Sequence, residues 1–207
     1  KPYAIHAIRL EVVKSEEQQL CFNPQSSTPM QKRISSTIDR VLKNGEALGI
    51  QVCVYHKGEV VINLSGGECG PVDPRPITPN TLFNSFSCGK ALSALLVHVM
   101  VDKGWIQSLE DKVTKYWPVF GAGNSKKQQC TVRMFLEHRA GLSGSTEPSA
   151  GIVELCDFDH MVDWMARAPL TETVGKPRYH MLTYGWLLGG LIEAVAVKNQ
   201  LDFSYSQ

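Results

Sequence analysis

Hydrophobic residues first recur at helical spacing between about residues 29 and 44. The stretch Thr28-Pro29-Met30-Gln31 precedes them, with the spacing of a capping box and proline at the first helical position. The apolar positions that follow are Ile34, Ile38, Val41 and Leu42. This pattern predicts a helix over 29–44.

The next segment alternates between apolar and polar residues, which is typical of strands. Residues 49–55 and 60–64 alternate on either side of a turn at 56–59, and we expect a β-hairpin. Residues 65–80 are rich in glycine and proline and predict a loop.

A second helical pattern starts at Ser87, after the apolar and aromatic segment 81–86. One side of this helix is expected to carry Leu92, Leu95, Leu96, Val99 and Met100. The pattern predicts a helix laid against a core, with Ser87 at or near its start.

Residues 91–170 are predicted to be mostly helical. We expect a short helix over 109–118, stopped by Pro118, and another that is capped by Thr131 and ends at Gly141.

A third helix in this region is predicted to begin at Asp157 or Asp159 and to end before Pro169. Its apolar stripe consists of Met161, Val162, Met165 and Ala168.

A glycine-containing helix is predicted to follow the polar loop that carries Tyr179. The spacing Gly185-x-x-x-Gly189 indicates close helix packing in a core, because Glu193 interrupts any membrane span.

Composition bounds the possible functions. The chain has 207 residues, of which 43% are hydrophobic and 20% charged, and its net charge is +1. These values are typical of a soluble globular protein with one good-sized core or two small ones. No dense Lys/Arg cluster is present, which argues against a nucleic-acid or membrane-surface partner and favours a small molecule.

The cysteines and the chain ends carry little targeting information. Cysteines stand at positions 21, 53, 69, 88, 130 and 156, without the spacing of a zinc site. Reduced thiols in an intracellular setting are the default expectation, with disulfides left open.

No apolar run is long enough to span a membrane and no secretory signal is visible. The chain starts at Lys1, so we expect a piece of a longer polypeptide, with residues 1–28 a linker or a remnant of a preceding region.

Ser87 and Lys90 are the first candidate catalytic residues of the chain. A helix start presents free backbone N–H groups to a developing oxyanion, and a residue three positions on shares the serine's helix face. A neighbouring base can then activate the serine hydroxyl as a nucleophile. The alternative is an ordinary helix cap with a solvated lysine.

Several motifs in order give the chain a resemblance to a known family. They are Phe83-x-x-x-Ser87-x-x-Lys90, then Leu136-x-His138-x-x-Gly141-Leu142, then Tyr179 followed by Tyr184-Gly185. Over roughly residues 30–197 the chain resembles the serine β-lactamase and penicillin-binding-protein superfamily, in particular its class C β-lactamase-like esterases. It is also similar to the β-lactamase-like domain at the C-terminal end of plant AarF-type atypical kinase proteins, which implies fusion to an upstream kinase-like domain.

The resemblance implies that Ser87 is the acylated nucleophile, Lys90 its proton relay and Tyr179 the general base. Read without the family, Tyr179 is an interface or core aromatic residue. His180 and Met181, next to Tyr179, are candidate substrate contacts, although His180 reads equally as a surface imidazole.

Two other side chains near these motifs are expected to have structural rather than catalytic roles. His138 is expected to cap or pack the end of its helix, because the family does its base chemistry without histidine. Cys88, one step from the serine on a helix, is expected to pack rather than to react.

Three departures from the family pattern matter. Met181 stands where many relatives have an asparagine that contacts the acyl amide, which favours esters over β-lactams. Ala140 replaces a frequent serine, with an expected effect on local packing only. A third motif of the Lys-Thr-Gly or His-x-Gly type is not found after residue 197, so the sheet is expected to have an open edge.

These observations predict an α/β (α+β) fold of the β-lactamase/transpeptidase type. Residues 29–207 are expected to form a partial domain that lacks the late sheet strands. The functional hypothesis is a serine hydrolase that forms an acyl-enzyme on a small-molecule ester or amide, using no cofactor and no metal. The rival hypothesis is a catalytically silent binding or regulatory domain.

Overall fold

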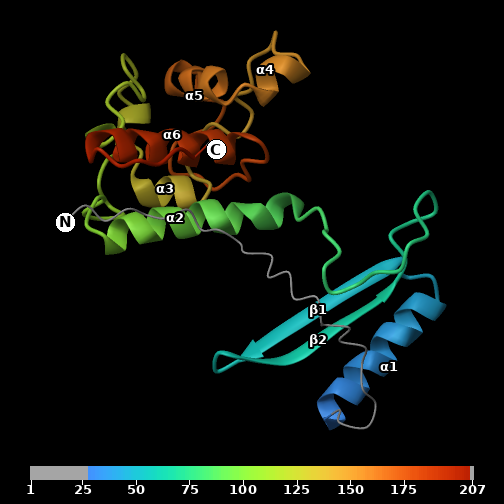
Figure 1. Cartoon of the computed structure of the whole chain (residues 1–207). Coiled ribbons are helices and arrows are strands. Elements are labelled where there is room, and N and C mark those ends of the chain that lie inside the picture. The colour runs from blue at the N-terminus through green and yellow to red at the C-terminus, as the bar shows by residue number, and fades with distance from the viewer. Residues whose placement is uncertain (1–27, 206–207) are drawn as a thin grey trace. The chain divides into compact units, whose positions relative to one another are not determined.

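The computed structural model describes residues 28–205, which divide into two compact units, residues 28–84 and 85–205 (Figure 1). The predicted linker or remnant over residues 1–28 lies outside the described residues, apart from Thr28.

Helix α1 (Pro29–Lys43) opens the first unit with the predicted capping box. The Thr28 hydroxyl accepts a hydrogen bond from the Gln31 backbone N–H at 3.2 Å, and the Gln31 side chain accepts one from the Thr28 N–H at 2.8 Å. One face of α1 packs against strand β2 (Glu59–Gly67) and buries Ile38 (Figure 1). The predicted helix is confirmed.

Strand β1 (Gly49–His56) pairs antiparallel with β2, with Gly49 opposite Gly67. The connection is the two-residue turn Lys57-Gly58, and both residues have positive φ, +53° and +85°. Such turns match the right-handed twist of paired strands. The predicted hairpin is confirmed, and β2 extends three residues, 65–67, into the segment predicted as a loop.

The second unit is helical and is built around α6 (Thr183–Lys198). This helix packs against α2 (Lys90–Asp102), α3 (Val132–Leu136) and α5 (Phe158–Arg167) (Figure 1). Among its fully buried apolar side chains are Leu188, Leu191, Ile192 and Val195. Together with the sheet of the first unit, this helical region confirms the predicted α/β class.

Two adjacent glycines allow α6 to pack closely. A methyl group on Gly190 would lie 2.5 Å from the Trp117 ring, and one on Gly189 would lie 2.6 Å from the Phe158 ring. Gly185 has nothing within 4 Å of the corresponding position. The predicted role in helix packing therefore holds for Gly189 and is wrong for Gly185.

The buried face of α2 matches the predicted one only in part: Met100 is buried and Leu96 packs partly buried against the core, as predicted. The helix buries Ser93, Val97 and Met100, whereas Leu92 and Leu95 are exposed. Because most positions of α2 are apolar, the sequence periodicity does not define one face unambiguously.

The predicted helix over 109–118 is wrong. Only the 3-10 turn η2 (Val113–Lys115) forms, because the backbone of Lys112 pairs with Thr131 and the Val113 N–H donates to the Cys130 carbonyl at 2.9 Å. A distant segment thus takes the hydrogen bonds that a helix would have used.

The caps of α3 and α5 are confirmed. The Thr131 hydroxyl accepts from the Met134 N–H, and the Asp157 carboxylate accepts from the His160 N–H. Helix α3 nevertheless ends at Leu136 rather than near Gly141, and the short helix α4 (Ile152–Cys156) was not expected.

Lys127, in the 3-10 helix η3 (Lys127–Gln129), is buried, with only 1% of its surface exposed. Its ammonium donates hydrogen bonds to three carbonyl oxygens at the end of α5, those of Met165, Ala166 and Ala168, each at 2.9 Å. A cation suits the C-terminal end of a helix. Burial lowers the pKa of this amine to about 8.

Candidate active site

Ser87 lies in the 3-10 helix η1 (Phe86–Gly89), which leads directly into α2. Lys90, the first residue of α2, lies one turn further on and donates a hydrogen bond from Nζ to Ser87 Oγ at 3.1 Å. The proximity that the three-residue spacing predicts is therefore present.

Tyr179 reaches the same oxygen from the loop before α6. Its hydroxyl donates to Ser87 Oγ at 2.7 Å, across 92 residues of sequence. The Lys90 ammonium also lies 5.1 Å from the centre of the Tyr179 ring. Ser87 Oγ is therefore the point where all three side chains meet.

This arrangement changes the acidity of the phenol. Hydrogen bonds with Ser87, then with Lys90, hold the pKa of Tyr179 below its usual value, because both neighbours stabilise the phenolate. The side chain is 51% exposed, so a small molecule can reach it.

The start of helix η1 also places backbone donors near the serine. Ser87 lies in the first turn, where backbone N–H groups lack an acceptor within the helix. Phe86, directly before it, has a φ of +43°, which is a strained conformation for a residue with a bulky side chain. Strained backbone of this kind is often found at functional sites.

His180, the residue after Tyr179, is buried rather than at the surface, with 1% of its area exposed. Its Nε2 accepts from the Leu142 N–H at 3.2 Å, so its Nδ1 carries the proton and donates to the Arg178 carbonyl at 2.6 Å. Burial lowers the pKa of His180, which favours this neutral form. Direct contact of this ring with substrate requires the ring to become exposed.

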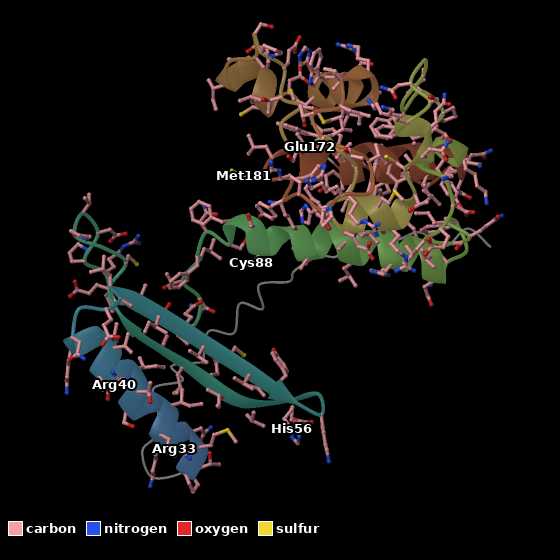
Figure 2. All side chains as sticks on the ribbon, turned by 180° about the vertical axis from the view of Figure 1, so that it is seen from behind. Arg33, Arg40, His56, Cys88, Glu172 and Met181 are labelled. Carbon is pink, nitrogen blue, oxygen red and sulfur yellow. The ribbon has the colours of Figure 1, made fainter. Side chains whose placement is uncertain are left out.

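Met181 and Cys88 lie towards the same end of the helical unit (Figure 2). Met181 is 65% exposed, so its thioether is accessible to a small molecule. The Cys88 side chain is also exposed, in contrast to the expectation that it packs. A substrate contact by Met181 stays a prediction.

Glu172 belongs to a polar network that the sequence analysis did not identify. Its carboxylate accepts from the Ser143 hydroxyl at 2.6 Å and from the Thr171 hydroxyl at 2.8 Å. Burial raises the pKa of this carboxyl, but the hydrogen bonds outweigh that effect and hold the pKa below its usual value. A lone glutamate in a polar loop gives no sequence signal for such a network.

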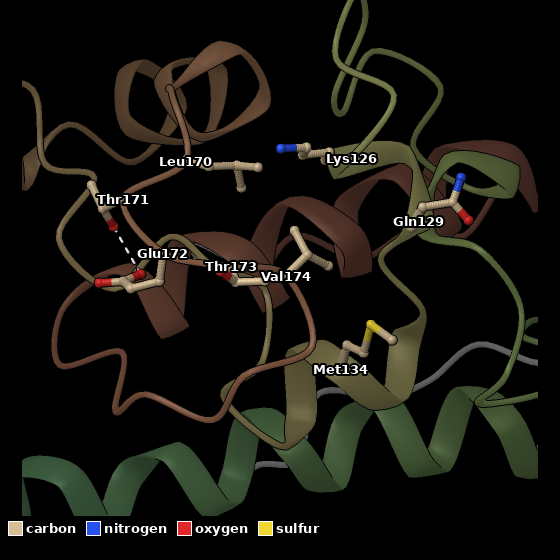
Figure 3. A pocket seen from close by; sticks show the side chains of 8 residues that line it. All are labelled: Lys126, Gln129, Met134, Leu170, Thr171, Glu172, Thr173 and Val174. Carbon is tan, nitrogen blue, oxygen red and sulfur yellow. Dashed lines mark hydrogen bonds between the residues drawn. The ribbon is translucent and has the colours of Figure 1, made fainter.

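A separate cavity of about 550 Å³ lies beside this network (Figure 3). It is lined by Lys126, Gln129, Met134, Leu170, Thr171, Glu172, Thr173 and Val174. Neither Ser87 nor Lys90 nor Tyr179 borders it, so the cavity is distinct from the convergence on Ser87 Oγ.

Over residues 28–205, no cluster of three His, Cys, Asp or Glu side chains is arranged to hold a metal ion. Within the same residues, none of the helices combines the length and the apolar character needed to cross a membrane.

Comparison with known proteins gives the family. Residues 34–204 match the family model described as Beta-lactamase. The chain therefore belongs to the β-lactamase family, and its fold is a portion of the β-lactamase-like α/β fold.

The relatives of this chain include esterases and a penicillin-binding-protein homologue. Esterase/beta-lactamase LipL of Mycobacterium tuberculosis is 35% identical over 151 residues, which are 73% of this chain and 34% of LipL. A family VIII carboxylesterase structure matches with a TM-score of 0.74 and 28% identity, over 83% of this chain and 46% of that one. A penicillin-binding-protein homologue from Caulobacter crescentus also gives a TM-score of 0.74, with 30% identity, over 83% and 45% of the two chains. The chain thus spans a third to a half of the length of these relatives.

Proposed function

We propose that this chain carries the nucleophile and general base of a serine hydrolase that forms an acyl-enzyme on a small-molecule ester or amide. The observation that supports the proposal best is the convergence of Lys90 and Tyr179 on Ser87 Oγ, at 3.1 and 2.7 Å. Both distances are within the reach needed for proton transfer.

The proposed reaction begins when Tyr179 has lost its proton. The phenolate then takes the proton of the Ser87 hydroxyl while Oγ attacks the substrate carbonyl, and the Lys90 ammonium stabilises the negative charge on the phenolate. The backbone N–H of Ser87 donates to the oxyanion of the tetrahedral intermediate. Tyr179 returns the proton to the departing alcohol or amine, which leaves an acyl group on Ser87.

Water completes the cycle. The phenolate, restored after the leaving group has gone, removes a proton from water, and the resulting hydroxide attacks the acyl-serine carbonyl. Ser87 recovers its proton as the carboxylic acid departs. Every step uses side chains and backbone of this chain, and none requires a cofactor.

An ester is the proposed substrate class, in line with the class C-like esterase branch. Met181 offers no strong hydrogen bond to an acyl amide, which weakens the binding of peptides and β-lactams relative to esters. Ester hydrolysis is also named for two of the relatives, an esterase/β-lactamase and a family VIII carboxylesterase.

The proposed organisation of the longer protein follows from the same resemblance. In this proposal residues 29–207 form part of a β-lactamase-like domain, residues 1–28 are a linker or a remnant of a preceding region, and a kinase-like domain lies upstream as in the plant AarF-type proteins.

A fluorophosphonate probe tests the proposal. The full-length protein, treated with the probe and mapped by peptide mass spectrometry, is expected to be labelled at Ser87, and Ser87→Ala is expected to lose the label. Cys88→Ser is the matched control, because it removes the neighbouring thiol and is expected to keep the label. Labelling that persists in Ser87→Ala contradicts the proposal.

A further inference from the structure

His138 is hydrogen-bonded to both sequence neighbours of Tyr179. Its carbonyl oxygen accepts from the Arg178 N–H at 2.9 Å, and its ring Nδ1 accepts from the His180 N–H at 3.0 Å. The backbone on each side of Tyr179 is therefore fixed to one residue.

His138 has a backbone conformation that residues with a side chain seldom adopt. Helix α3 ends in a Schellman motif, in which the Arg139 N–H donates to the Met134 carbonyl and the His138 N–H to the Phe135 carbonyl. His138 holds the left-handed position of this motif, with a φ of +59°. Glycine is commonest there because it has no Cβ, so an imidazole at this position suggests a role for the ring.

The ring itself packs between two tyrosines. Its centre lies 4.4 Å from that of Tyr184, in a stacked arrangement, and 4.9 Å from that of Tyr179. Tyr184 belongs to α6 and is buried, so it gives the imidazole a rigid support. Contact with the Tyr179 ring restricts the direction in which the phenol points.

The charged and titratable groups around His138 favour a neutral ring. They are Lys90 from α2, Tyr184 from α6, and Tyr179 and His180 from the loop before α6. Burial, then His180 and Lys90, lowers the pKa of His138. A neutral ring with its proton on Nε2 keeps Nδ1 free to accept from the His180 N–H.

We infer that His138 is a positioning residue, which holds the phenol of Tyr179 at hydrogen-bonding distance from Ser87 Oγ. This inference rests on the proposed function, since it assigns His138 a role in the activity of Tyr179. His138 does not touch Ser87 in this arrangement, and it acts through the backbone and ring of its neighbour.

Two substitutions separate positioning from simple stability. His138→Gly removes the ring and the acceptor but suits the left-handed backbone, which offsets part of the stability lost with the ring, so the variant is expected to stay folded, and its melting temperature is measured beside kcat. His138→Asn also tolerates this backbone, and its Oδ1 takes the place of Nδ1. The pair therefore differs mainly in the acceptor for the His180 N–H.

The inference is tested by measuring kcat and KM of the full-length variants with p-nitrophenyl acetate. We expect kcat of His138→Gly to fall about 30- to 100-fold with KM within about threefold, as a displaced catalytic group predicts. His138→Asn is expected to stay within about fivefold of the wild-type kcat, because the hydrogen bond is restored. Wild-type kcat in His138→Gly, or equal losses in the two variants, overturns the inference.

Failure of the proposed function gives a different pattern. If Ser87→Ala turns over the ester as fast as the wild type, the proposed nucleophile is wrong, whatever His138 does. If Ser87→Ala is inactive and His138→Gly is fully active, only the positioning role is wrong.

Discussion

Replacing Tyr179 by phenylalanine removes one oxygen atom from the candidate site and little else. The phenol oxygen lies 2.7 Å from Ser87 Oγ, while the ring that remains keeps its contact with His138 at 4.9 Å. The side chain is half exposed, so one lost hydrogen bond changes the folding equilibrium by less than about tenfold.

The expected effect on catalysis is much larger. A positioned general base contributes about 10²- to 10⁴-fold to rate, so kcat for p-nitrophenyl acetate is expected to fall at least about 100-fold in Tyr179→Phe. The melting temperature is expected to change by less than about 3 °C. This contrast separates loss of a base from loss of folded protein.

The pH dependence gives a second test of the same variant. The phenolate is the active form, so wild-type kcat is expected to rise with pH through the pKa of Tyr179. This pKa lies below the usual value of 10.0, because Ser87 and Lys90 stabilise the phenolate. Tyr179→Phe is expected to lose that rise.

Tyr55→Phe provides the matched control, because Tyr55 is an exposed phenol on the hairpin, and it is expected to keep wild-type activity. A Tyr179→Phe variant with kcat within about threefold of the wild type, or with the pH rise intact, refutes the assignment of Tyr179 as the base.

Three further predictions concern stability, each measured by urea unfolding followed by tryptophan fluorescence. Lys127→Met leaves carbonyls at the end of α5 without their donor and is expected to lower the free energy of unfolding by about 3 kcal/mol. The pKa of Lys127 is about 8 in the folded protein, below the usual 10.5, so its contribution to stability is expected to rise with pH between these two values. Gly190→Ala forces a methyl group against Trp117 and is expected to cost about 1–3 kcal/mol, whereas Gly185→Ala, in open space on the same helix, is expected to add about 0.5–1 kcal/mol. Glu172→Gln is expected to lose less stability on acidification than the wild type. The Glu172 carboxyl has a lowered pKa in the folded state, so its contribution to stability is lost as pH falls below about 4.5. A variant whose stability falls with pH as the wild type's does contradicts this account.

Local sequence signals predicted the elements that depend on local interactions. The Thr28 capping box, the turn at Lys57-Gly58 and the Asp157 cap each involve residues within a few positions of one another. Such hydrogen bonds form in the same way whatever surrounds them, so their patterns are readable in one sequence.

Non-local interactions account for what the sequence did not show. The segment 109–118 loses its helix to pairing with residues 130–131, and Lys127 is buried because three carbonyls at the end of α5 surround its amine. The left-handed φ of His138 likewise goes against the usual preference of histidine. None of these features has a signal within its own segment.

The candidate site likewise combines a local contact that the sequence predicts with a non-local contact that it does not. The three-residue spacing of Ser87 and Lys90 predicts their contact on one helix face, and that contact is present. Tyr179 entered only through the family resemblance, since no spacing rule connects residues 92 positions apart. The chemical roles of all three remain predictions.

The long separation between Ser87 and Tyr179 has a consequence for biosynthesis. A nascent polypeptide that has emerged as far as α5 contains the serine and the lysine but not the phenol. In the proposed mechanism such a chain cannot yet hydrolyse esters, so Ser87 stays without its general base until Tyr179 has been synthesised. In the same mechanism, reactivity arises only when the loop before α6 has left the ribosome and docked next to Ser87.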